Sequence, residues 1–321
     1  MTKKIAVVIP CYKVQNHILN VINQIDQNVH KIYVIDDCCP NCSGDFVENM
    51  CKDERITIIR NSINRGVGGA VMAGYKAAIE NGADVIVKID GDGQMDPRLI
   101  KRFVGPILSG QADYTKGNRF YDLTLLGNMP AIRIMGNAIL SFMTKLSSGC
   151  WSIFDPTNGY TAIHARVAAH LPMEKISNRY FFETDMLFRL NTLRAVVVDI
   201  PMKAVYGDEK SNMLVSKIVI YFLAKHIKNT LKRIFYNYFL RDMTIASLEL
   251  IFGLILLVFG FSFGIVKWYG AMITNTPAPL GIIMLAALPF LLGIQLLLSF
   301  IGYDIANVPK RPIHNDLPDV Y

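Results

Sequence analysis

Residues 85–94 read VIVKIDGDGQ, an apolar run that ends in two carboxylates one residue apart. The β-branched run predicts a buried strand, because near-continuous apolar strands belong to sheets that are covered on both faces. Asp90 and Asp92 follow at its carboxyl end, where sheets of this kind bind ligands. Two such carboxylates cannot both stay ionised without a nearby cation, which predicts Mg²⁺ or Mn²⁺ shared with substrate phosphates. Gln94 can add a neutral oxygen, and a solvated turn is the alternative interpretation.

Similar β-branched runs, separated by helix-like stretches, extend on both sides of this segment from Lys4 to about Tyr206. This alternation predicts an α/β domain with a mainly parallel sheet, which we place at residues 1–210. The expected strands cover residues 5–9, 31–35, 56–59, 85–89 and 195–198. The expected helices lie around residues 17–27, 69–81 and 97–110.

The 321-residue chain is 52% hydrophobic and only 18% charged, and its mean hydropathy is +0.30. This composition excludes a disordered chain and indicates that some residues lie in lipid. Lys and Arg exceed Asp and Glu by 33 to 26, and the resulting net charge of +7 suits an anionic partner. Among such partners we expect a nucleotide and a phospholipid surface, and no nucleic acid.

Residues 211–243 are basic and amphipathic, and they lead directly into lipid-like sequence. Cations alternate with aromatic and aliphatic side chains and there is almost no acid, which is typical of helices that lie in the headgroup plane. A core helix with one solvated face is the alternative. The cations of this segment include Lys217, Lys225, Lys228, Lys232 and Arg233.

Residues 244–306 predict a hairpin of two transmembrane helices, at about 245–266 and 280–303. Each segment reaches about 20 mostly apolar residues, which is the length that crosses a bilayer. Cations precede the first helix and recur at Lys310 and Arg311 after the second. The positive-inside rule therefore places the large domain and the tail, residues 307–321, on the cytoplasmic side of the inner membrane.

Three shorter features are compatible with binding but each has a simpler explanation. Asp36 and Asp37 end an expected strand, where a carboxylate could bind a base or ribose, or could cap the following turn. Residues 64–70 read NRGVGGA and could bring helix N–H groups to an anion, or form only a tight turn. Cys39 and Cys42 form a CxxC pair, but no second pair completes a zinc site, so we expect the cysteines to act as small apolar residues.

In order and spacing these motifs resemble glycosyltransferase family two. The resemblance is greatest to the branch of dolichyl-phosphate mannose synthases and bacterial polyprenyl-phosphate glycosyltransferases. It is carried by residues 9–12 (IPCY), 36–37 (DD), 64–70, 90–94 (DGDGQ), 117–119 (GNR), 155–160 (DPTNGY), 182–186 (FETDM) and 206–211 (YGDEKS). The small polar turn that usually follows the second aspartate is replaced by CCPNCS at residues 38–43, which puts base contacts near that loop in doubt.

The resemblance implies a GT-A fold, a UDP- or GDP-linked sugar donor and a Mg²⁺ or Mn²⁺ cofactor. It implies that the nucleotide sugar contacts Pro10, Tyr12, Asp36, Asp37, Arg65, Gly66, Asp90 and Gly91. The implied metal ligands are Asp90, Asp92 and Gln94, and the implied catalytic residues are Asp92, Asp155 and Arg119. The implied cations for the acceptor phosphate are Arg119, Arg133, Lys203 and Lys210.

Together these features predict a membrane-anchored, inverting enzyme that moves a sugar onto a polyprenyl phosphate of the undecaprenyl or dolichyl type. One alternative is a hydroxyl acceptor, for which Glu183 or Asp185 would act as the base. Another is a membrane-tethered protein that binds nucleotide sugars without turnover. A processive polysaccharide synthase is disfavoured, because two helices cannot enclose a polymer channel. The sequence leaves open which sugar and base are used and whether the chain forms a homo-oligomer.

Overall fold

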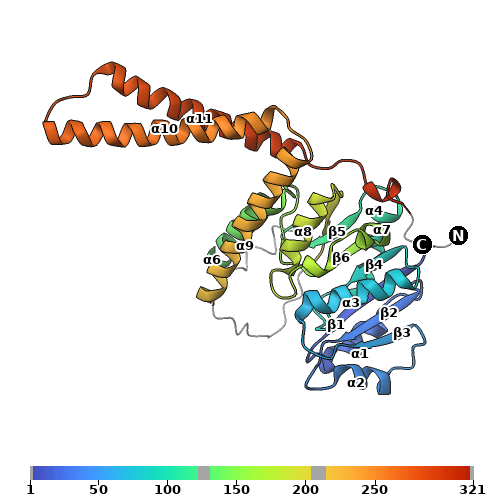
Figure 1. Cartoon of the computed structure of the whole chain (residues 1–321). Helices are drawn as coiled ribbons and strands as arrows, with labels where there is room; N and C mark the ends of the chain where they lie inside the picture. Colours follow the sequence, from blue (N-terminus) through green and yellow to red (C-terminus); the bar gives the residue numbers. More distant parts are fainter. Residues whose placement is uncertain (1–2, 122–130, 204–214, 319–321) are drawn as a thin grey trace. The chain divides into compact units, whose positions relative to one another are not determined.

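The computed structural model describes residues 3–121, 131–203 and 215–318 (Figure 1). The chain forms two compact units, one made of Met1–Thr230 with Pro309–Tyr321 and the other of Leu231–Val308. We call the first the catalytic unit, after the activity expected from the sequence, and the second the hairpin unit. The catalytic unit reaches beyond the expected boundary at residue 210, and it also includes most of the expected tail.

The catalytic unit contains a seven-stranded sheet in the order β3-β2-β1-β4-β6-β5-β7. Six of these strands run parallel to one another, and β6 is antiparallel to its neighbours β4 and β5. The prediction of a mainly parallel sheet is therefore confirmed. The strands are β1 (Ile5–Cys11), β2 (Lys31–Asp36), β3 (Ile56–Arg60), β4 (Val85–Lys88), β5 (Tyr114–Asn118), β6 (Thr161–His164) and β7 (Val197–Pro201).

Helices cover both faces of the sheet (Figure 1). Successive residues of a strand point to opposite faces, so apolar residues in a row give each strand an apolar side chain on both faces. In β1, Val7 and Ile9 belong to a core with α1, α2 and α4, whereas Ala6 and Val8 belong to a second core with α3, α7 and α8. The helices are α1 (Gln15–Asn23), α2 (Ser43–Met50), α3 (Gly66–Glu80), α4 (Ile100–Leu108), α6 (Ala131–Ser148), α7 (Ala165–Ala169), α8 (Phe182–Thr192) and α9 (Val215–Phe235). Short 3₁₀ turns cover Pro97–Leu99, Met173–Lys175 and Ile313–Asn315.

The strands β5 and β6 lie where the sequence predicted none. Both are short and partly polar, with Lys116 and Asn118 in β5, so their conformation depends on pairing with neighbours. The helices α6 and α8 were also not predicted. By contrast, α1, α3 and α4 correspond to expected helices, and each of their ends lies within four residues of the expected end.

The last described residues of the chain return to the catalytic unit. The backbone N–H groups of Ile313 and His314 each donate to the fully buried Asp113 carboxylate at 2.9 Å. The His314 ring also lies 2.7 Å from this carboxylate and stacks on His164. These contacts are the physical reason why the tail belongs to this unit.

In the hairpin unit, α10 (Ile245–Thr274) packs along α11 (Leu280–Ala306). Both are long and apolar enough to cross a membrane, and only 11% and 6% of their most apolar stretches are buried, unlike a soluble core helix. Glycines permit close approach, since a Cβ on Gly260 would lie 2.6 Å from the Phe290 nitrogen and one on Gly293 would lie 2.5 Å from the Leu257 nitrogen. The helix α10 continues past the predicted end at residue 266.

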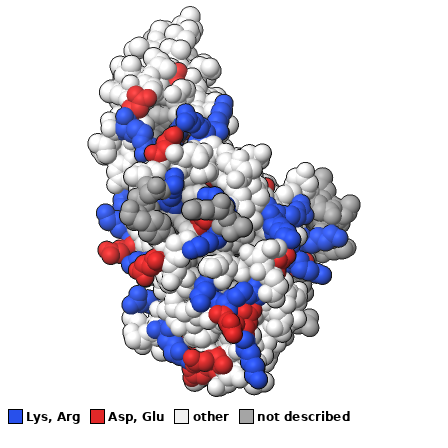
Figure 2. Space-filling view, turned by 90° about the vertical axis from the view of Figure 1, so that its right-hand side faces the viewer, with Lys and Arg blue, Asp and Glu red and all other residues white. Residues whose placement is uncertain are grey.

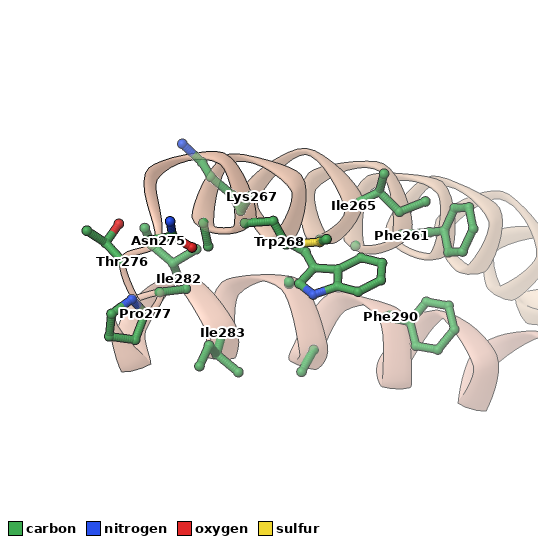
Figure 3. A pocket seen from close by; sticks show the side chains of 17 residues that line it. Phe261, Ile265, Lys267, Trp268, Asn275, Thr276, Pro277, Ile282, Ile283 and Phe290 are labelled. Carbon is green, nitrogen blue, oxygen red and sulfur yellow. The ribbon is translucent and has the colours of Figure 1, made fainter.

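An apolar pocket of about 800 Å³ lies between α10 and α11, where the Trp268 indole projects toward the facing helix (Figure 3). Ile283 and Phe290 line it from that helix, and Lys267 is its charged residue. No carboxylate is among the lining residues of this pocket.

Within the described part of the basic segment, Arg233 is buried and not at a solvated position. Arg233, expected in the amphipathic surface, is 2% exposed and forms a two-fold ion pair with Asp304 of α11, at 2.6 and 2.9 Å. The Tyr238 hydroxyl, in the π-helical stretch Tyr236–Leu240, donates to the same carboxylate at 2.6 Å. The expectation for Arg233 was wrong because composition alone cannot locate an acid 71 residues away.

Candidate active site

A pocket of about 750 Å³ opens at the carboxyl ends of β1, β2 and β4. Parallel strands end at the same edge of a sheet, so residues far apart in sequence meet there. Seven residues predicted from the sequence line the pocket, namely Pro10, Tyr12, Asp37, Gly66, Asp90, Gly91 and Asp92. Lys13, Asn64, Arg179 and Tyr180 also line it and were not predicted.

The two aspartates that follow β2 have different roles. The Asp36 carboxylate accepts hydrogen bonds from the backbone N–H groups of Cys39 and Gly44, at 2.7 and 2.6 Å, and therefore caps the following turn. The Asp37 carboxylate lines the pocket and also accepts from the N–H groups of Arg65 and Gly66, at 2.9 and 2.6 Å. Asp37 thus joins the end of β2 to the start of α3, and Arg65 takes part through its backbone.

The glycine-rich start of α3 packs against protein. The N–H groups of Gly68 and Gly69 point to the Asn178 carbonyl, at 2.8 and 3.4 Å. A Cβ on Gly68 would lie 2.3 Å from the Ser177 carbonyl oxygen, so a larger residue would displace the segment 177–182. The glycines therefore allow this segment to reach the pocket, and the anion-binding interpretation of residues 64–70 is not supported.

The first carboxylate of the DGD motif is paired with a buried lysine. Lys88 Nζ lies 2.7 Å from Asp90 Oδ1 and 3.9 Å from Glu183 Oε1, and the Lys88 side chain is 1% exposed. Burial alone would lower the pKa of Lys88, but Asp90 and Glu183 raise it above its usual value. Burial raises the pKa of Glu183, against the opposing effect of Lys88 and Lys116. The Asp90 side chain remains 28% exposed and faces the pocket.

Asp90 and Asp92 fit a divalent cation that shares its ligands with a phosphate. Among the described residues, no group of three or more His, Cys, Asp or Glu is arranged to hold a metal. Mg²⁺ needs only one or two carboxylates when phosphate oxygens complete its coordination. The Gln94 backbone N–H donates to Asp92 Oδ1 at 2.9 Å and so orients this carboxylate.

Arg119 and Asp155 form a second ion pair at the sheet edge. The Arg119 guanidinium donates to both Asp155 oxygens, at 2.7 and 2.9 Å, while Asp155 is fully buried and Arg119 is 28% exposed. The same loop reaches the DGD motif, since a Cβ on Gly159 would lie 2.3 Å from Lys88 Nζ and 2.7 Å from Asp90 Oδ2. The segment 155–159 therefore connects Arg119 with the carboxylates of the DGD motif.

The structure places the other predicted cations unequally. Lys203 is exposed just after β7, whose residue Pro201 pairs with Asn118 next to Arg119. Arg133 lies in the first turn of α6, but its side chain is outside the described set, and Lys210 is outside the described residues altogether. The adjacency of Arg119 and Lys203 comes from the parallel pairing of β5 and β7.

The two acids proposed as a base also differ. The Asp185 carboxylate accepts from the Ser177 N–H at 2.8 Å and from the Asn229 amide at 3.0 Å, and it is 4% exposed. It holds the segment 177–182 and α9 in place. Glu183 lies beside Lys88 near the pocket, and burial raises the pKa of its carboxyl group.

The pocket residues that sequence reasoning missed are brought there by contacts between segments that are distant in sequence. Arg179 and Tyr180 precede the quoted FETDM motif and reach the pocket only because α3 begins with glycines. Lys13 has a left-handed backbone, with φ of 61°, and its N–H points to Cys39 Sγ at 3.1 Å. The cysteine that replaces the usual turn therefore supports the pocket wall.

Comparisons with known proteins identify the family. Residues 6–171 match the model for Glycosyl transferase family 2. The chain belongs to this family. It is 27% identical over 220 residues to a UDP-N-acetylglucosamine–dolichyl-phosphate N-acetylglucosaminyltransferase from Methanococcus voltae, which covers 64% of this chain and 87% of the relative. It is 24% identical to an undecaprenyl-phosphate 4-deoxy-4-formamido-L-arabinose transferase from Klebsiella pneumoniae, over 97% of this chain and 91% of that one.

A solved structure agrees on the fold. A glucosyl-3-phosphoglycerate synthase from Mycobacterium tuberculosis, crystallised with Mn²⁺, uridine diphosphate and phosphoglyceric acid, superposes with a TM-score of 0.53. The match covers 72% of this chain and 78% of that chain at 17% identity. The chain is therefore a glycosyltransferase with a GT-A catalytic unit, as the sequence predicted.

Proposed function

We propose that this glycosyltransferase moves a sugar from a nucleoside diphosphate donor to the phosphate of a polyprenyl lipid, with inversion, at the cytoplasmic surface of the membrane. The observation that carries the proposal is the segment 155–159, which joins the carboxylates of the donor pocket to Arg119. The acceptors in the names of the relatives, dolichyl phosphate and undecaprenyl phosphate, support it.

The donor is placed in the pocket by residues from three strand ends. Pro10 and Tyr12 at the end of β1, Asp37 after β2, and Arg179 and Tyr180 of the segment 177–182 line the pocket together with the DGD motif. Asp90 and Asp92 would hold Mg²⁺ or Mn²⁺ against the donor phosphates. When bound, such an ion neutralises charge on the leaving nucleoside diphosphate.

The acceptor is held by cations. A phosphomonoester is already anionic near pH 7, so its oxygen can attack the anomeric carbon without a base, while the sugar–phosphate bond of the donor breaks. Two phosphates must then be held close together against their repulsion. Arg119, oriented by Asp155, and Lys203 supply positive charge at the ends of β5 and β7. The hydrogen bonds of Asp185 give it a structural role, which favours a phosphate over a hydroxyl acceptor.

Exposed apolar side chains support contact between the catalytic unit and lipid. In α6, Met135, Ile139 and Phe142 are each more than half exposed, and the same is true of Ile220 and Ile227 in α9. The hydrogen bond between His226 and Ser147, at 2.8 Å, joins these two helices. Exposed apolar rows beside basic residues are typical of surfaces that lie in the headgroup layer. Figure 2 shows basic side chains at several places on one face, with acidic side chains among them.

The proposal is tested by incubating the chain in detergent with a panel of nucleotide sugars, Mn²⁺ and a prenyl phosphate. We expect a lipid product in which the sugar is attached through phosphate. Arg119→Lys should raise the acceptor KM about tenfold, because lysine cannot make the two-fold contact with Asp155. Arg60→Lys, at an exposed ion pair, is the matched control and should leave this KM unchanged. A sugar attached to a hydroxyl, with no phosphodiester to the lipid, would overturn the proposal.

A further inference from the structure

Lys88 lies beside Asp90, one of the two proposed metal ligands. It was not among the site residues predicted from the sequence. Its ammonium group lies 2.7 Å from Asp90 Oδ1, and its side chain is 1% exposed. Gly159 closes the other side, since a Cβ there would lie 2.3 Å from Lys88 Nζ. Lys88 therefore cannot turn away into solvent, and its charge stays beside Asp90.

The positive charge of Lys88 reduces the net negative charge that the DGD motif presents to a cation. Two carboxylates line the pocket at this point, and Lys88 offsets one of them. The second acid that Lys88 approaches, Glu183 at 3.9 Å, is not among the residues that line the pocket. Asp90, Asp92 and Lys88 together carry a net charge of about −1, which attracts a divalent cation only weakly unless the donor brings phosphate oxygens.

We propose that Lys88 is a positioning residue that makes metal binding depend on the donor. It orients Asp90 and weakens the binding of a lone cation, so that the ion is held tightly only together with a nucleoside diphosphate. Coupling of this kind is reciprocal, so the metal must strengthen nucleotide binding by the same factor. The inference rests on the proposed metal-dependent function, and it goes beyond it by naming the residue that couples the two ligands.

The test measures Mn²⁺ binding by the electron paramagnetic resonance signal of free Mn²⁺, using the full chain in detergent. Binding is measured without nucleotide and with saturating UDP or GDP, whichever binds. For the wild-type chain, the nucleotide should tighten Mn²⁺ binding at least tenfold. Lys88→Met removes the charge and keeps an unbranched side chain, so Mn²⁺ should bind the nucleotide-free variant about tenfold more tightly than it binds the wild type.

Two further variants separate this effect from a folding defect. Lys88→Met combined with Glu183→Gln removes one charge of each sign, and it should show the same tighter Mn²⁺ binding with a less perturbed unfolding midpoint. Glu183→Gln alone keeps the Lys88–Asp90 contact, so Mn²⁺ binding without nucleotide should not tighten.

The proposal is overturned if Mn²⁺ binding without nucleotide is unchanged or weaker in both the Lys88→Met variant and the double variant. It is also overturned if the wild-type chain binds Mn²⁺ equally well with and without nucleotide. The assay contains no lipid, so a failure to form a prenyl-linked product would contradict the proposed function and leave these binding results as they are.

Discussion

The catalytic unit and the hairpin unit both contain buried ion pairs, but the pairs differ in how much of each is exposed. In the catalytic unit, Asp90 and Arg119 are each 28% exposed, while their partners Lys88 and Asp155 are almost completely buried. In the hairpin unit, Arg233 and Asp304 have side chains only 2% and 7% exposed, and the Tyr238 hydroxyl adds a further contact. We call a pair half-open when one partner is partly exposed, as in the catalytic unit, and closed when both partners are buried, as in the hairpin unit.

The difference has a physical meaning. A closed pair satisfies its own charges, so its role is to hold chain segments together, and breaking it leaves a buried charge without a partner. A half-open pair uses a buried partner to orient a charged group that still faces a pocket. Groups of this second type are therefore candidates for ligand contacts, whereas burial of charge alone is not evidence of a site.

The largest effect is expected in the pocket of the catalytic unit. Asp92→Ala should lower sugar transfer more than a thousandfold, about 4 kcal/mol in activation free energy, because it removes a proposed metal ligand. The midpoint of thermal unfolding should change little, since Asp92 is only partly buried. Asp45→Ala, at an exposed ion pair, is the control. Full turnover by Asp92→Ala, or by the metal-depleted wild type in excess EDTA, would remove the metal assignment.

A closed pair should show the opposite profile. Arg233→Gln removes the two-fold ion pair from the buried Asp304 and leaves the Tyr238 contact, and it should destabilise the hairpin unit by about 3 kcal/mol. The acceptor and donor KM of the folded fraction should stay near wild-type values. Limited proteolysis in detergent measures the first effect and initial rates measure the second, with Lys228→Gln at an exposed position as the control. A changed donor KM with unchanged protease resistance would mean that closed pairs also tune the site.

The smallest expected effect is a difference between the two units in how their stability responds to pH. Burial lowers the pKa of His164 and of His226 from 6.5 to about 4 in the catalytic unit. Between these values the unfolded chain binds more protons, so the free energy of unfolding should fall as the pH falls from 6.5 to 4. Residues 245–306 contain no histidine. Hydrogen exchange should therefore show α7 and α9 losing protection before α10 and α11, and equal loss in all four would contradict this assignment.

Much of the architecture could be predicted because its signals are local. Apolar runs identified β1, β2, β3 and β4, and uninterrupted apolar composition identified the two hairpin helices. The DGD motif followed from the chemistry of two adjacent carboxylates at a strand end. Each of these features depends on residues within one segment, where side-chain pattern and backbone conformation are directly linked.

The tertiary structure decided whatever depends on distant partners. Polar β5 and β6 become strands only through pairing, and β6 takes its antiparallel direction from β4 and β5, which lie much earlier in the chain. The pairing of Lys88 with Glu183, of Arg119 with Asp155 and of Arg233 with Asp304 joins residues that no periodicity connects. The charge of a residue is written in the sequence, but whether that charge is open to a ligand or closed by a partner is set by chain segments that meet only on folding.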